Sequence, residues 1–138
     1  MSSLRKSALS GAGMIVLTAA VLSLGACERP PIGKGEFGRT VSMSRGDVLV
    51  SANGDALYTF DKDTPDHSNC TDACAATWPP AVADADAQPH GKFSIITRPG
   101  GARQWAYQGK PLYTYKLDGG PGSISGDNYN GVWHVAKP

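Results

Sequence analysis

The chain has 138 residues and a formal net charge of +1, a length that predicts one globular domain. Once the first 26 residues are set aside as a targeting segment, 112 residues remain, with 11 basic and 12 acidic side chains. A balance this close to neutral argues against nucleic acid as a partner and against a polybasic membrane patch.

Residues 1–26 have the pattern of a bacterial lipoprotein signal peptide. Arg5 and Lys6 precede an apolar run from Ala12 to Leu24. This run is too short and too rich in small residues for a typical transmembrane helix. The run ends in Leu24-Gly25-Ala26-Cys27, which resembles a lipobox whose Cys is lipidated and becomes the new N-terminus. An ordinary secretory signal followed by a chance Cys is the alternative.

Lipidation of Cys27 predicts that acyl chains, and not charge, hold the protein to a membrane. Glu28 follows the Cys, and in a Gram-negative organism the lack of Asp there favours the outer membrane, with the domain facing the periplasm. Residues 27–40 are rich in Pro and Gly and show no apolar period, so we interpret them as a flexible tether.

The strongest feature of the remaining chain is a repeat with an offset of 55 residues. Both copies have the form Gly-x-x-Leu-Tyr-Thr-aromatic-x-x-Asp, at residues 54–63 and 109–118, and each copy is followed by a Trp, Trp78 or Trp133. A repeated unit of this length cannot bury a core alone. We therefore expect two units, about 41–83 and 92–138, in one domain spanning 41–138.

The expected elements are short strands joined by turns. Asn53-Gly54 predicts a type I′ hairpin turn, and Gln108-Gly109 occupies the same place in the second unit. Residues 70–77 predict one helical turn, capped by Asn69 or Thr71 and stopped by Trp78-Pro79-Pro80. The predicted fold class is all-β: a compact antiparallel sandwich or small barrel built from two pseudo-twofold repeats. The expected strands are Val48–Ser51, Ala56–Phe60, Ala81–Ala83, Lys92–Thr97, Arg103–Tyr107, Lys110–Lys116 and Gly131–Ala136.

Cys70 and Cys74 remain as a pair when Cys27 carries lipid. An exported protein meets oxidising conditions, so a Cys70–Cys74 disulfide is expected. A redox or metal-binding dithiol is the alternative, although three intervening residues do not match the redox spacing and no second pair completes a zinc site.

These motifs together are similar to those of a bacterial secreted-repeat lipoprotein family with a Tyr-x-aromatic-x-x-Asp motif. The carrying residues are Tyr58, Phe60 and Asp63 in the first unit, Tyr113, Tyr115 and Asp118 in the second, the segment from Cys70 to Pro80, and the closing Gly131-Val132-Trp133. The resemblance implies an exported, anchored β domain and no reaction. Because the second unit lacks the Cys pair and Trp-Pro-Pro, any site on the twofold would be asymmetric.

The candidate chemistry is sparse. Asp63 and Asp118 recur at the end of an aromatic strand, which favours turn-holding carboxylates over a pair of ligands. Asp61, Asp63, Asp66 and His67 share one loop and are weak candidates for a metal site, although the loop lacks the glycine and distal Glu of an EF-hand. No catalytic residue and no cofactor are predicted, and a bound metal ion is left open.

The sequence contains none of the common hydrolase or phosphate-binding motifs. We therefore expect a lipid-anchored, non-enzymatic binding or interaction module whose partner is an unknown envelope protein or small ligand. Exposed aromatic residues and the loop at 61–67 are the expected contact surface. The alternative is a periplasmic metal-binding or redox-linked protein, with His67 and nearby carboxylates as ligands.

Overall fold

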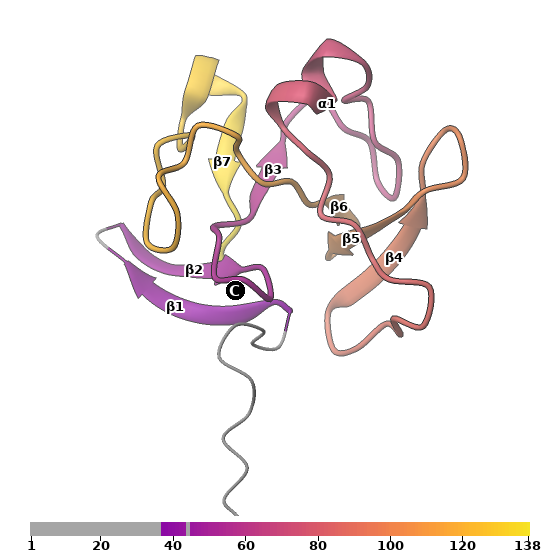
Figure 1. The fold of residues 1–138 in the computed structure, drawn as a ribbon, viewed down its shortest axis with the longest axis horizontal. Helices are drawn as coiled ribbons and strands as arrows, with labels where there is room; N and C mark the ends of the chain where they lie inside the picture. The colour runs from indigo at the N-terminus through magenta and orange to yellow at the C-terminus, as the bar shows by residue number, and fades with distance from the viewer. Residues whose placement is uncertain (1–36, 44) are drawn as a thin grey trace, which may run out of the picture. The chain divides into compact units, whose positions relative to one another are not determined.

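The computed structural model describes residues 37–43 and 45–138, which form seven short strands and almost no helix (Figure 1). The signal peptide, Cys27 and most of the predicted tether lie outside these residues. The all-β, two-repeat prediction is confirmed. The elements are β1 (Arg39–Met43), β2 (Gly46–Val50), β3 (Tyr58–Phe60), α1 (Ala73–Thr77), β4 (Phe93–Thr97), β5 (Arg103–Tyr107), β6 (Lys110–Pro111), the 3₁₀ turn η1 (Tyr129–Gly131) and β7 (Trp133–Val135).

The strands form three small antiparallel sheets, β1–β2, β3–β7 and β4–β5–β6. Strand β3 of the first repeat pairs with β7 of the second, with Thr59 opposite His134, so the two ends of the domain are joined (Figure 1). An isolated bridge joins Tyr58 to Tyr113 through two backbone hydrogen bonds of 2.8 and 3.0 Å. The strand that closes each repeat therefore lies against the other repeat.

The closing segment of the second repeat completes the hairpin of the first. The backbone N–H of Leu49 donates to the Ala136 carbonyl at 2.8 Å, and the Ala136 N–H donates to the Leu57 carbonyl at 2.7 Å. The buried side chains of Leu49, Leu57 and Ala136 then pack together.

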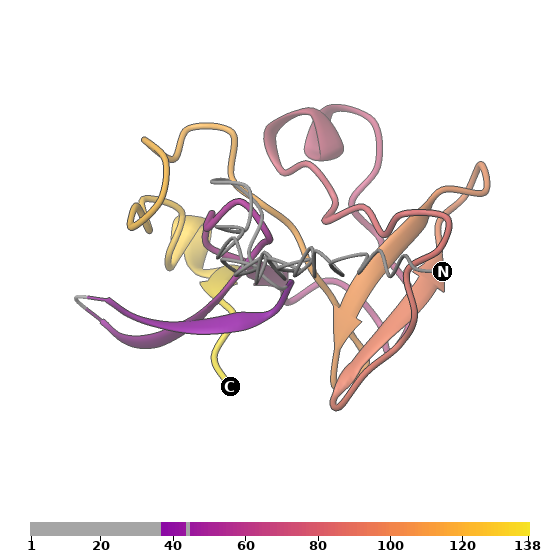
Figure 2. The same cartoon turned by 60° about the horizontal axis from the view of Figure 1, so that its bottom comes forward.

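The closing segment of the first repeat does the same for the second hairpin. Ala81 accepts a bond of 2.8 Å from the Trp105 N–H and donates one of 2.9 Å to the Leu112 carbonyl. Figures 1 and 2 draw the purple β1–β2 hairpin and the orange β4–β5 hairpin on different sides of the domain. The closing segments of the two repeats lie between these hairpins.

The linker between the repeats is held by one side chain. The guanidinium of Arg103 donates to the backbone carbonyls of Asp84, Ala85 and Ala87. Residues 84–92 contain no strand, as expected for a connection rich in Asp, Ala and Pro.

Several local predictions are wrong. The turn at Asn53-Gly54 is not type I′, because only Gly54 has a positive φ (90°) and the Gly54 N–H bonds back to the Ser51 carbonyl. Gln108 and Gly109 both have positive φ, 49° and 77°, as type I′ requires. The N-cap of α1 is Asp72, without a side-chain cap bond, and not Asn69 or Thr71.

Strand lengths also differ from expectation. The segment 81–83 forms only an isolated bridge at Val82, and the expected strand at 110–116 is reduced to β6 plus bridges at Tyr113. The β1–β2 hairpin was not predicted, and β1 begins at Arg39, two residues before the expected start of the first unit.

Candidate functional site

The repeated motif residues meet where the two repeats cross. The hydroxyl of Tyr58 donates to Asp118 Oδ2 at 2.8 Å, and the hydroxyl of Tyr113 donates to Asp63 Oδ2 at 2.7 Å. Each tyrosine therefore bonds the aspartate of the other repeat. Both tyrosine side chains are fully buried, whereas the two aspartates are half-buried, so the two bonds lie at the edge of the core.

Each aspartate also holds the loop that follows its own strand. Asp63 Oδ1 accepts the Asn69 N–H at 2.7 Å, and Asp118 Oδ1 accepts the Ser125 N–H at 2.8 Å. This is the turn-holding role that the repetition of the carboxylates suggested. Both oxygens of each carboxylate therefore already accept a hydrogen bond within the protein.

Burial shifts the pKa values of these groups. Loss of water around the hydroxyls, with a further contribution from the bonded carboxylates, raises the pKa of Tyr58 and of Tyr113 well above the ordinary value of 10. Burial also raises the pKa of Asp63 above 3.8, and the hydrogen bonds from Asn69 and Tyr113 offset only part of this effect. The tyrosines thus stay protonated as hydrogen-bond donors.

Four aromatic rings stack between the two tyrosines. Phe60 stacks on Trp133 at 4.2 Å between centroids, Trp133 on Trp78 at 3.9 Å, and Trp78 on Tyr115 at 4.2 Å. The order is symmetric, because Phe60 corresponds to Tyr115 and Trp78 to Trp133 under the 55-residue offset. Aromatic pairs of this kind add to the stability given by buried area. Trp78, Tyr115 and Trp133 are buried in the core, and Phe60 packs against it while partly exposed.

A buried arginine that the sequence did not reveal lies beside this core. Arg98 is 8% exposed, and it donates to Ser68 Oγ at 2.8 Å, to Gln104 Oε1 at 2.7 Å and to the Cys70 carbonyl at 2.6 Å. Ser68 Oγ is in turn bonded to the Tyr113 hydroxyl at 2.7 Å. No local sequence signal marks the Arg98 side chain as buried.

The disulfide lies next to this network. Cys70 and Cys74 are bonded, as predicted, with their Cα atoms 5.2 Å apart. The side chain of Cys70 is fully buried in the aromatic core, and its carbonyl accepts the bond from Arg98. The disulfide therefore holds the segment before α1 in place, so that the Cys70 carbonyl can accept the hydrogen bond from Arg98.

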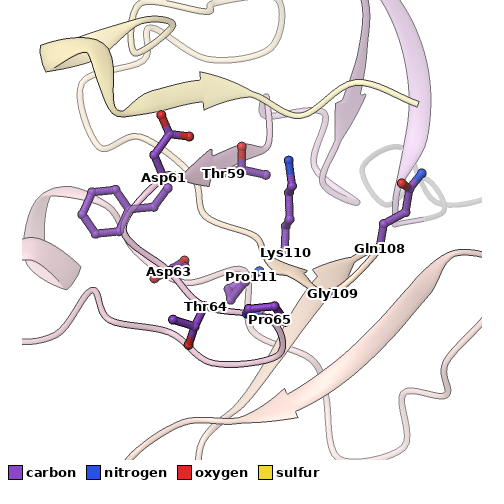
Figure 3. Close-up of a pocket in the computed structure, with 10 residues that line it drawn as sticks. Thr59, Asp61, Asp63, Thr64, Pro65, Gln108, Gly109, Lys110 and Pro111 are labelled. Carbon is purple, nitrogen blue, oxygen red and sulfur yellow. The ribbon is translucent and has the colours of Figure 1, made fainter.

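A groove at the junction of the repeats is the best candidate for a ligand site (Figure 3). It consists of two adjoining cavities of about 270 and 450 Å³, close to the size range of small-molecule sites. The first repeat supplies the end of β3 and the following loop, and the second repeat supplies its hairpin turn and C-terminal residues. The smaller cavity is lined by Thr59, Phe60, Asp61, Asp63, Thr64, Pro65, Gln108, Gly109, Lys110 and Pro111.

Four polar residues line both cavities: Thr59, Asp61, Gln108 and Lys110. Within residues 37–43 and 45–138, the side chains of Thr59, Gln108 and Lys110 form no hydrogen bond or ion pair with another residue. Asp61 uses one oxygen, Oδ2, in a contact of 2.9 Å with His134 Nε2. The part of the groove shared by the two cavities therefore contains side-chain donors and acceptors that are free to bind a ligand. Of these four residues, the sequence analysis had singled out only Asp61.

The weak metal candidates are not brought together. Asp61 pairs with His134, Asp63 lies against Tyr113, and Asp66 follows in a turn whose N–H bonds to the Gly109 carbonyl. His67 is exposed, with its backbone bonded to that of Thr64. In the described part of the chain, no three His, Cys, Asp or Glu side chains are placed to hold a metal ion.

The fold and the motif core define a class of exported all-β module in which two repeats complete each other. A family described as a secreted repeat of unknown function matches residues 39–82 and 94–137, one match for each repeat. The chain belongs to this family, and its place is accordingly outside the cell or in the cell envelope. No curated protein and no solved structure matches the chain. Among the described residues, no helix is long and apolar enough to cross a membrane.

Proposed function

We propose that this protein is a lipid-anchored module of the cell envelope that binds a small polar ligand in the groove between its repeats. The supporting observation is the set of Thr59, Asp61, Gln108 and Lys110, whose side chains line both cavities and keep unused hydrogen-bonding groups. A ligand site of this kind needs a few convergent polar groups on a preformed concave surface.

The groups that resemble catalytic residues favour a non-enzymatic role. A general acid or base needs a lone pair or proton that can reach a substrate. Both oxygens of Asp63 and of Asp118 are bonded within the protein, and the hydroxyls of Tyr58 and Tyr113 are buried. Binding without chemistry is therefore the simpler use of the groove.

The binding function can be tested on the full, processed chain in mild detergent. A ¹⁵N-labelled sample is titrated with a panel of amino acids, short peptides, organic acids, amines and sugars. We expect at least one compound to shift the amide signals of Thr59, Gln108 and Lys110 in a saturable way, while those of Asp55 and Lys116, the repeat equivalents of Lys110 and Asp61, stay unchanged. A panel without any groove-specific shift argues against the proposal.

The anchor has its own test. We propose that Cys27 carries lipid and that residues 28–36 tether the domain to the periplasmic face of the outer membrane in a Gram-negative cell. Membership of a secreted family and the lipobox-like Leu24-Gly25-Ala26-Cys27 support this. Cys27→Ser should move the protein from the membrane fraction to the soluble fraction and remove the lipid mass; membrane retention of a lipid-free variant contradicts it.

A redox-linked role is the second candidate, and the stacked core favours it. Oxidation of Tyr58 by one electron would release its phenolic proton, which Asp118 is bonded to accept, and the stacked Trp78 and Trp133 lie between the two tyrosines. Photo-oxidation with a ruthenium(III) complex should then give a tyrosyl radical signal that Tyr58→Phe with Tyr113→Phe removes. A radical confined to the exposed Tyr129 argues against this role.

A further inference from the structure

The unused polar groups of the groove separate into positive and negative ends. Lys110 supplies an ammonium group and Gln108 an amide, both able to donate hydrogen bonds. Asp61 supplies a carboxylate whose Oδ1 has no partner among the described residues, because only Oδ2 contacts His134. In Figure 3 the labelled side chains follow the order Asp61, Thr59, Lys110 and Gln108 along the groove, so the hydroxyl of Thr59 lies between the two charges.

The backbone at Gln108 supports a role for this end of the groove. Gln108 has φ of 49°, a left-handed conformation that is uncommon outside Gly, Asn and Asp. The corresponding residue of the first repeat is Asn53, a residue type better suited to such a turn, yet Asn53 does not adopt positive φ. A longer amide in the strained position extends a donor into the groove next to Lys110.

We propose that the groove binds a small zwitterion, of the kind represented by a free amino acid or a short peptide. The ligand's carboxylate accepts hydrogen bonds from Lys110 and Gln108. Its ammonium group donates hydrogen bonds to Asp61 and to the Thr59 hydroxyl. The proposal rests on the binding function above and specifies the ligand class for that site. Charge-assisted hydrogen bonds of both signs select a zwitterion over a simple anion or cation.

The rest of the groove suits a ligand of this size. The smaller cavity of about 270 Å³ has an apolar side formed by Phe60, Pro65 and Pro111, which accommodates a short aliphatic portion. The larger cavity continues past Lys137 and the C-terminal Pro138, so a ligand longer than one residue has room to extend.

The positions equivalent to the groove under the repeat provide a matched control, because they carry the opposite charges. Asp55 corresponds to Lys110, and Lys116 corresponds to Asp61, under the same offset of 55 residues. There the loop after Asp118 brings Pro121 close to the first hairpin turn, since a Cβ added to Gly54 would lie 3.5 Å from the Pro121 side chain. Charge changes at Asp55 and Lys116 therefore alter the net charge equally without touching the proposed site.

The test uses glycylglycine and two blocked forms, titrated against the full, processed chain in detergent and followed by the amide signals of the groove. N-acetylglycylglycine lacks the ammonium group, and glycylglycine amide lacks the carboxylate. We expect each blocked form to bind about fivefold more weakly than glycylglycine, the effect of about 1 kcal/mol for one exposed charge pair.

Two variants assign each charge to its partner. In Lys110→Gln, glycylglycine and its amide should bind equally; in Asp61→Asn, glycylglycine and its acetylated form should bind equally. Asp55→Asn and Lys116→Gln should retain both fivefold differences. Asp61, Lys110 and Lys116 are exposed and Asp55 is half-buried, and the amide spectrum shows whether each variant is folded.

The two proposals fail in different ways. If N-acetylglycylglycine, or acetate alone, shifts the groove amides as strongly as glycylglycine, the zwitterion proposal is wrong and the groove binds anions. If glycylglycine gives no groove shift while another class of compound does, the zwitterion proposal is again wrong and the binding function stands. If no compound shifts the groove, both are wrong.

Discussion

The Tyr58 hydroxyl donates to Asp118 Oδ2 at 2.8 Å, a bond between residues 60 positions apart that joins the first repeat to the second. The reciprocal bond runs from Tyr113 to Asp63 at 2.7 Å. A motif that looks like a local unit in the sequence is therefore satisfied only across the repeats. An isolated repeat would lack the tyrosine donor for its aspartate and the acceptor for its tyrosine, and it would expose to water the core surface that the other repeat covers.

We predict that the two repeats stay together when the chain is cut between them. A protease site inserted after Gln88 should allow complete cleavage, yet the fragments should co-elute in native buffer, because β3–β7 pairing and the tyrosine–aspartate bonds do not depend on the linker. Gel filtration and circular dichroism measure this. Each fragment expressed alone should be unfolded; a fragment with a cooperative melt of its own contradicts the interlocked core.

The raised pKa of Asp63 predicts a specific pH dependence of stability. Because the folded pKa lies above the ordinary 3.8, the folded state binds the proton more tightly, and Asp63 contributes stability that is present below 3.8 and lost as pH rises through the folded value. Asp63→Asn removes this contribution. The difference in unfolding free energy, wild type minus variant, should therefore decrease from pH 3 to pH 7.

Denaturant melts at several pH values measure that difference. Asp86→Asn is a suitable control, since the Asp86 side chain is exposed and should give a difference that stays flat. A wild-type advantage that grows with pH would mean that hydrogen bonds to Asn69 and Tyr113 outweigh burial.

The repeat, the approximate positions of β2 to β5 and β7, and the disulfide follow from local sequence, because Gly-containing turns, alternating apolar residues and paired cysteines act over a few positions. The pairing of each repeat's closing segment with the other repeat's hairpin does not follow from local sequence. Neither Ala81 nor Ala136 shows a preference for one hairpin over the other. The type I′ prediction at Asn53-Gly54 was wrong for a related reason. The dipeptide allows a type I′ turn, but the hydrogen bond from the Gly54 N–H to the Ser51 carbonyl selects another turn type. The groove arises only when both repeats are in place.

Arg98 is predicted to be the costliest polar residue to remove. Arg98→Leu leaves Ser68, Gln104 and the Cys70 carbonyl without their common donor inside the core. We expect a loss of about 2–4 kcal/mol of unfolding free energy, measured by chemical denaturation. Arg39→Leu, at an exposed position, should change stability by less than about 0.5 kcal/mol. Equal effects would show that the buried network contributes little.

Loss of the disulfide should destabilise the domain without unfolding it. A bridge over so few residues removes little entropy from the unfolded chain, so Cys70→Ala with Cys74→Ala should cost about 2 kcal/mol. Denaturant melts of the double variant, and of the wild type with and without reductant, measure this. If the reduced protein loses its fold altogether, the bridge carries more of the fold than its loop length implies.

The stacked core also predicts that Gly126 does not tolerate a side chain. A Cβ on Gly126 would lie 2.6 Å from the Trp78 ring and 3.0 Å from Tyr115, whereas a Cβ on Gly119 would meet nothing within 4 Å. Neither glycine has a positive φ, so the two differ in available space and not in backbone strain. We expect Gly126→Ala to cost about 1–3 kcal/mol by forcing the rings apart, and Gly119→Ala to be neutral or slightly stabilising.

Thermal melts compare the two variants, and the near-ultraviolet circular dichroism of Trp78 and Trp133 should change only in Gly126→Ala. If both variants behave alike, the four-ring stack has room that its centroid distances of 3.9 to 4.2 Å do not indicate.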